Sequence, residues 1–155
     1  MLMTHNIQVT VMTLACGVTW GIGTVILLFY NGVILGAISA DYVGAGYTRF
    51  LAGWLLPHGA IEIPAILLGG QAGLVLAGAV IGWGERASRV DRLRRVAGDL
   101  LSIALGAAAL LVWAGLVEAF VSQYHQPVLP YGLKIAFGLL ELGALSIFLA
   151  RAGRV

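Results

Sequence analysis

The stretch LLSIALGAAALLVWAGLVEAFV, residues 100–121, decides the fold class. It carries a single charged side chain, Glu118, in 22 residues, and about 20 apolar residues in a helix cross the ~30 Å hydrocarbon core of a bilayer. Residues 131–150 form a second stretch of nearly the same length. Residues 122–130 separate the two stretches and contain two prolines and several polar side chains, which predicts a turn. The sequence therefore predicts a transmembrane helical hairpin.

Two further apolar blocks, residues 6–40 and 49–83, are too long to cross a membrane once. Each would make about 50 Å of straight helix at ~1.5 Å per residue, well beyond the hydrocarbon core. We therefore predict a break in each block, because Asn-Gly favours turns and proline disfavours helix at the residue before it. The predicted breaks are at Asn31-Gly32 and at Pro57-His58-Gly59. The resulting spans are residues 6–29, 32–43, 60–83, 100–121 and 131–150.

The composition agrees with an all-α bundle in lipid. Hydrophobic residues make up 60% of the 155 residues and charged residues 10%, and the mean hydropathy is +0.96. An average soluble domain is about 25% charged, and a soluble globule of this size must cover its surface with polar groups. We expect residues 1–155 to form one polytopic transmembrane domain in contact with membrane lipid.

The charged residues are concentrated in one predicted loop, residues 85–95. This loop carries five arginines, and the positive-inside rule places it in the cytoplasm. A basic stretch there can bind anionic lipid or a cytoplasmic partner, or it can be an ordinary stop-transfer loop. Because the positive charge is not spread over a surface, nucleic acid is not an expected partner. The arginines are Arg86, Arg89, Arg92, Arg94 and Arg95.

A cytoplasmic loop at residues 85–95 determines the orientation of all five predicted spans. Arg151 and Arg154, after the last span, also fall on the cytoplasmic side, so two basic sites agree. The first span then begins outside the cell. The chain starts without a cleavable signal peptide, so we expect additional residues upstream, including a further span.

Glycine, with 22 residues, is the other compositional signal. Small residues four apart let membrane helices approach closely, either within one chain or between copies in a homo-oligomer. Such pairs occur at Gly17/Gly21, Gly32/Gly36, Gly69/Gly73 and Gly78/Gly82.

Ionisable side chains are costly inside a membrane, so each is a functional candidate. His58 and Glu62 lie four residues apart on one helix face. They can form a metal or proton-relay site, or Glu62 can satisfy His58 or the backbone donors freed at the predicted break. We predict that Glu118 pairs with Lys134 across the hairpin, unless Lys134 extends alone to the headgroups.

Glu141 lies ten residues into the last span, and its partner cannot be named from the sequence. The predicted topology gathers the other ionisable residues in the outer half of the membrane. The sequence therefore predicts an outward-facing polar cluster. Its members are His58, Glu62, Glu118, Lys134, Glu141 and Asn31.

Several short motifs, in order along nearly the whole chain, resemble those of the stage II sporulation protein M (SpoIIM) family. Together, Tyr-Asn-Gly, Pro-His-Gly-x-x-Glu and Glu-x-Phe-Val-Ser form a fairly specific set. The matching stretches are THNI (residues 4–7), LFYNG (28–32) with LGA (35–37), LPHG (56–59) with Glu62, GG (69–70) with Gly73, and GLVEAFVS (115–122).

The resemblance implies a multi-pass protein of the bacterial cytoplasmic (inner) membrane. In spore formers the family acts with peptidoglycan-degrading partners during engulfment, and relatives also occur in bacteria that do not sporulate. Longer members carry an additional N-terminal region and span. We expect a non-catalytic scaffold for cell-envelope partners, with no cofactor. The alternatives are a transporter or channel built on the broken helices and an intramembrane metal-dependent hydrolase using His58 and Glu62.

Overall fold

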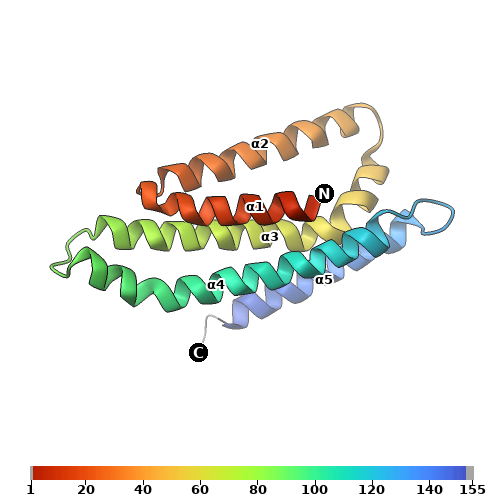
Figure 1. The fold of residues 1–155 in the computed structure, drawn as a ribbon. Helices are drawn as coiled ribbons and strands as arrows, with labels where there is room; N and C mark the ends of the chain where they lie inside the picture. The colour runs from red at the N-terminus through yellow and green to blue at the C-terminus, as the bar shows by residue number, and fades with distance from the viewer. Residues whose placement is uncertain (1, 153–155) are drawn as a thin grey trace.

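The computed structural model describes residues 2–152, which form a bundle of helices with no strand in that range. Its helices run back and forth along one axis (Figure 1). The all-α fold predicted from the sequence is confirmed. The elements are α1 (Leu2–Ala15), a 3-10 turn η1 (Cys16–Thr19), α2 (Ile22–Gly44), α3 (Thr48–Ile81), α4 (Arg89–Val117), a π-helical turn η2 (Glu118–Ser122) and α5 (Tyr131–Ala152).

Four of the helices, α2 to α5 with η2 continuing α4, are long and apolar enough to cross a membrane. The shorter α1 has 14 residues and packs along α3. Helix α3 is central, because every other helix contacts it. The chain is therefore a polytopic membrane bundle, organised around one helix that is covered on several sides.

The first predicted break is wrong, because α2 runs without interruption through Asn31-Gly32. Asn31 donates from Nδ2 to the Leu27 carbonyl one turn earlier, at 2.8 Å, so its side chain bonds within the helix. The chain turns instead at Trp20 and Gly21, whose φ angles of 56° and 81° are left-handed. Lipid offers no hydrogen bonds to a broken helix, which favours a continuous α2 in an apolar block.

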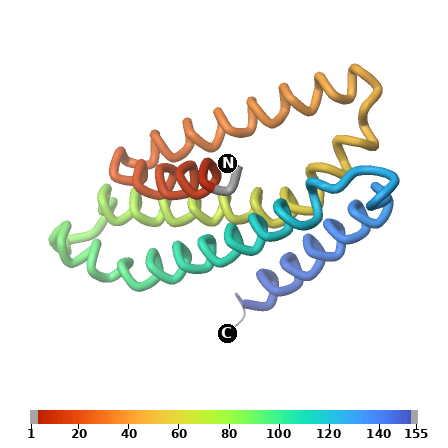
Figure 2. The backbone as a smooth tube through the Cα atoms, turned by 45° about the vertical axis from the view of Figure 1, so that its right-hand side comes forward, coloured from red at the N-terminus to blue at the C-terminus, as the bar shows by residue number. Residues whose placement is uncertain are grey.

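The second predicted break is a bend. Helix α3 contains Pro57 and Pro64 and is continuous over its 34 residues. Figures 1 and 2 show its first turns crossing the direction of the remainder. Proline removes one helical hydrogen bond and kinks a helix, and neighbouring helices make such kinks tolerable in membranes. The bend accommodates a helix longer than the hydrocarbon core.

Close backbone contact joins α1 and η1 to α3. A Cβ at Gly17 of η1 would overlap the Gly73 carbonyl oxygen, so this crossing has no room for a side chain. Thr24 of α2 donates to the Thr13 carbonyl of α1 at 2.7 Å, which fixes the hairpin between these helices. Gly69 packs in the same way against Thr10. Glycines at this crossing therefore serve packing within the chain.

The predicted arginine loop is partly helical, because α4 begins at Arg89. Ser88 caps it by accepting from the Asp91 backbone N–H. The Arg92 guanidinium donates to the carbonyls of Ala79 and Val80, at 2.9 and 3.3 Å, and so caps the end of α3. Arg92 therefore caps a helix within the chain, a role that its position in a basic stretch did not predict.

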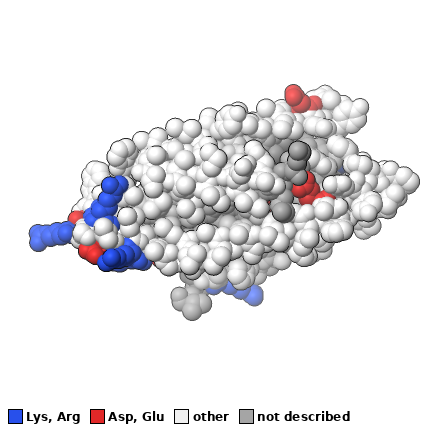
Figure 3. Space-filling model, viewed as in Figure 1, with Lys and Arg blue, Asp and Glu red and all other residues white. Residues whose placement is uncertain are grey.

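Figure 3 shows most of the visible Lys and Arg side chains clustered at one end of a largely uncharged face. The turn between α1 and α2 lies at the same end, and residues 123–130 lie at the opposite end (Figure 1). At the arginine-rich end, Arg95 pairs with Glu85 across the connection between α3 and α4. Arg151 lies exposed in the last turn of α5, and Arg154 lies outside the described residues.

Candidate functional site

A buried polar cluster joins three segments at the end of the bundle opposite the arginines. His58 Nδ1 of α3 lies 2.9 Å from Ser122 Oγ. Lys134 Nζ, in the first turns of α5, donates to the carbonyls of Ser122 and Tyr124 at 2.8 and 3.0 Å. His58, Ser122 and Lys134 are 2%, 0% and 1% exposed. We call these three residues the polar lock, because their hydrogen bonds tie α3, η2 and α5 together.

The π-helical turn η2 provides the geometry of the polar lock. It widens the end of α4 over Glu118–Ser122, and π turns of this kind are often found at functional sites. The hydroxyl of Ser122 faces α3 while its carbonyl accepts from Lys134. One residue thus contacts the helices on both sides.

The predicted ion pair between Glu118 and Lys134 is wrong. In residues 2–152 the salt bridge formed is the one between Arg95 and Glu85. Lys134 also does not extend to the headgroups, because it is 1% exposed. Its ammonium instead binds carbonyls that the π turn and the following loop leave without helical partners. Glu118 and Lys134 are equally far from the turn, which predicts a similar depth in the membrane. Similar depth does not determine which face of its helix each residue occupies.

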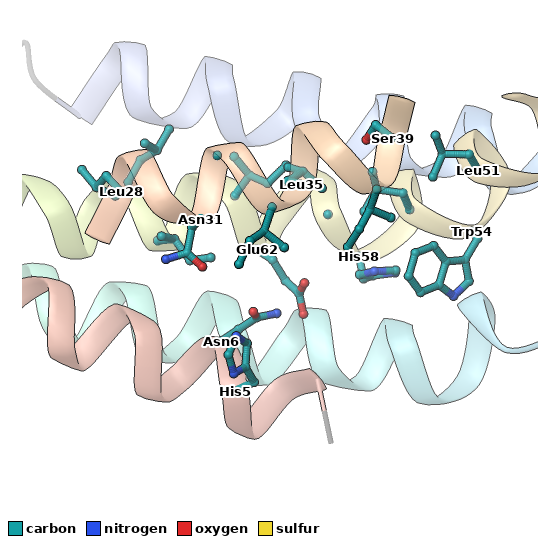
Figure 4. Close-up of a pocket in the computed structure, with 18 residues that line it drawn as sticks. His5, Asn6, Leu28, Asn31, Leu35, Ser39, Leu51, Trp54, His58 and Glu62 are labelled. Carbon is teal, nitrogen blue, oxygen red and sulfur yellow. The ribbon is translucent and has the colours of Figure 1, made fainter. Parts of the chain in front are cut away.

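Glu62 lies one turn after His58, and both residues line a cavity of about 300 Å³ between α3, α2 and the first turns of α1. In the described part of the chain, Glu62 forms no hydrogen bond with His58. Figure 4 shows its carboxylate pointing from α3 toward Asn6 of α1, with His5 beside it. Glu62 is 7% exposed, and its Oε1 has no hydrogen-bond partner within the described part of the chain. Neither predicted role, as partner of His58 or as cap of a break, is observed.

The cavity is mostly apolar, with a few polar side chains. Asn31 and Ser39 contribute from α2, and Trp54 lies edge-on to His58 with ring centroids 5.5 Å apart. Among the described residues that line it, none is Lys or Arg. The cavity therefore combines an acidic group with an apolar wall.

Glu141 lies apart from both features. Its Oε1 accepts from Trp113 Nε1 of α4 at 2.6 Å, and its Oε2 is buried without a partner among the residues described. Glu118 and Glu141 do not line the cavity that contains Glu62. The single polar cluster expected from the sequence is thus divided into the Trp113–Glu141 pair and two sites that share His58, the polar lock and the Glu62 cavity.

Several residues that organise these sites were missed from the sequence. Trp113 is uncharged and lies in an apolar stretch, whereas Asn6 and Ser122 are small polar residues that the sequence marked solely as members of short motifs. Within residues 2–152, no three His, Cys, Asp or Glu side chains are grouped as metal ligands. His58 and Glu62 therefore lack a third side chain of this kind in that range.

A family model described as stage II sporulation protein M matches residues 1–123. The chain belongs to this family. It is also similar to an uncharacterized protein of Methanocaldococcus jannaschii, with 27% identity over 125 residues, covering 78% of this chain and 68% of that protein. No solved structure matches.

The SpoIIM motifs converge in the structure. The THNI stretch and the Pro-His-Gly-x-x-Glu stretch meet at the Glu62 cavity (Figure 4), and the Glu-x-Phe-Val-Ser stretch forms the π turn against His58. Helix α5 lies beyond the matched residues. Lys134 therefore completes the polar lock from a segment that the family match does not include.

Proposed function

We propose that this SpoIIM protein is a non-catalytic scaffold of the bacterial cytoplasmic membrane, which assembles proteins that remodel the cell envelope. The observation that carries the proposal is the open surface of α2. Within the most apolar stretch of α2, just 6% is buried inside the bundle, whereas 44% of the corresponding stretch of α3 is buried. Figures 1 and 2 show α2 diverging from α1 and α3 toward its C-terminal end. A helix held at one end offers a long surface to a partner in the membrane.

The glycines of α2 suit this role. A Cβ at Gly32 or at Gly36 would meet nothing within 4 Å. A small-xxx-small pair that is unused within the chain lets another transmembrane helix approach the backbone closely. The partner is an envelope protein or a second copy of the chain. The polar lock supports scaffolding in another way, because its hydrogen bonds are directed inward and hold helices together.

The test is site-specific photo-crosslinking in native membranes. A benzoyl-phenylalanine at Gly36 should crosslink to identified envelope or peptidoglycan-remodelling proteins, and the same probe at Leu105, on the exposed side of α4, should not. Equal products from both positions, or crosslinks to lipid alone at Gly36, would overturn the proposal.

A transporter is the second candidate, supported by the cavity at Glu62. Against it, Glu118 and Glu141 do not line that cavity, so the three acids do not share one path. Solute or proton flux in proteoliposomes that is lost in Glu62→Gln would favour transport over scaffolding.

A further inference from the structure

The Glu62 cavity has the features of a binding site, because it contains a buried carboxylate oxygen that lacks a hydrogen-bond partner in the described part of the chain. Glu62 is more than nine-tenths buried, points into the space between α1 and α3, and leaves Oε1 without a donor among the residues that the structure describes. A buried carboxylate oxygen without a hydrogen bond is costly. A ligand that brings a hydrogen-bond donor and positive charge would remove that cost.

The residues that line the cavity determine the charge and the shape of a ligand that fits it. The described lining residues include no Lys or Arg, and their one carboxylate is Glu62, so an anionic group would face like charge with no Lys or Arg to balance it. Leu28, Ile63 and Leu67 supply an apolar wall beside Glu62. At about 300 Å³, the cavity is at the lower end of small-molecule sites, which run from about 300 to 1,000 Å³.

The position in the bundle suits an amphiphile. Glu62 lies 19 residues before Ile81, the end of α3 beside the arginines. At ~1.5 Å per residue this is about 28 Å, close to the thickness of the hydrocarbon core. Glu62 therefore lies near the membrane surface away from the arginines. Leu28 and Leu67 continue the wall toward the membrane centre, as the chain of a lipid would run.

We propose that this cavity binds the protonated primary amine of a single-chain or lipid amphiphile, with the amine at Glu62 and the alkyl chain along α2 and α3. A primary ammonium donates hydrogen bonds to Oε1, which a quaternary ammonium cannot do. Asn6 completes the head-group site from α1 (Figure 4). The cavity shares Gly32 with the partner surface proposed for α2, and the purified chain tests ligand binding without a protein partner.

The probe is dodecylamine, added to the purified full chain in phosphatidylcholine nanodiscs. We expect saturable binding of one molecule per chain by native mass spectrometry, with a rise in Tm. Dodecyltrimethylammonium and dodecanoate, which have the same chain but lack the donor or reverse the charge, should not raise Tm. Equal effects of all three amphiphiles would overturn the proposal.

Two variants test the location. Glu62→Gln should weaken dodecylamine binding about tenfold or more, because a charge-assisted hydrogen bond is lost. Gly32→Leu should block binding while leaving Glu62 in place, because Gly32 lines the cavity and its Cβ direction is open. Gly36→Leu is the matched control, since Gly36 is equally open but does not line the cavity.

If Glu62→Gln fails to fold, the comparison of dodecylamine binding by Gly32→Leu and by Gly36→Leu tests the location of the site. Unchanged binding in Gly32→Leu would overturn the proposal. Nanodiscs with phosphatidylethanolamine distinguish the source of the amine. If this lipid raises Tm and competes with dodecylamine, the ligand is a lipid headgroup; if dodecylamine alone binds, it is a free amine. Both results require Glu62 and support the inference.

Discussion

His58 Nδ1 and Ser122 Oγ lie 2.9 Å apart and join two helices across 64 residues of sequence. Both side chains are buried in the bundle. Ser122→Ala should lower the free energy of unfolding by about 1–3 kcal/mol, because it leaves a buried ring nitrogen without a partner. Denaturant titration in micelles, followed by circular dichroism, measures the change.

The control for this prediction is Ser102→Ala, because Ser102 bonds back to Gly98 in its own exposed helix surface. It should change stability by no more than about 0.5 kcal/mol. Equal decreases in the free energy of unfolding for the two serine variants would show that the contact with His58 does not stabilise the bundle.

Lys134 should hold residues 123–130 in place, because its ammonium binds the carbonyls of Ser122 and Tyr124. Lys134→Met keeps the length of the side chain and removes both hydrogen bonds. We expect amide hydrogen exchange in residues 123–130 to become about tenfold faster or more. Arg151→Met, at the exposed end of the same helix, should leave this exchange unchanged, and a similar acceleration there would argue against a local anchor.

Gly73 should tolerate no side chain. A Cβ there would lie 2.6 Å from the Thr13 carbonyl oxygen, and backbone cannot yield as a flexible side chain can. Gly73→Ala should cost roughly 1–3 kcal/mol by overpacking. Gly78→Ala on the same helix meets nothing within 4 Å and should be neutral or slightly stabilising. Matching stabilities of the two variants would contradict the close crossing of α1 and α3.

Arg92 and Arg89 should differ although they carry the same charge. Arg92 donates to the carbonyls of Ala79, Val80 and Ala87, and no hydrogen bond within the described residues involves the Arg89 side chain. Arg92→Ala should destabilise the protein by about 1–3 kcal/mol, because the last carbonyls of α3 lose their cap. Arg89→Ala should leave thermal stability nearly unchanged. Similar losses would mean that net charge, and not capping, is responsible.

The membrane orientation can be tested with single cysteines in a Cys16→Ala background. The positive-inside rule predicts that Val90→Cys, in the arginine-rich first turn of α4, reacts with an impermeant maleimide from the cytoplasm alone. Gln126→Cys, in the exposed loop at the other end of the bundle (Figure 1), should react from outside. Labelling of Gln126→Cys from the cytoplasm alone would reverse the orientation.

The sequence was sufficient for the fold class, because apolar length and composition act locally. Its short motifs, in order along the chain, were sufficient for the family. A run such as residues 100–121 must be a membrane helix wherever its neighbours lie. The hairpin of α4 and α5 follows from the same reasoning. Turn propensity was misleading at Asn31-Gly32, since in lipid the cost of unsatisfied backbone groups outweighs the local preference of Asn-Gly for a turn.

Tertiary structure alone decided how the polar residues are distributed. His58 and Glu62 share a helix face and line the same cavity, yet Ser122 binds the His58 ring while the Glu62 carboxylate points toward Asn6 of α1. These outcomes depend on which helix packs against each side of α3 and on the π turn that aims Ser122. Spacing along one helix determines which side chains are neighbours on that helix, whereas the partner of a buried polar group is set by packing between helices.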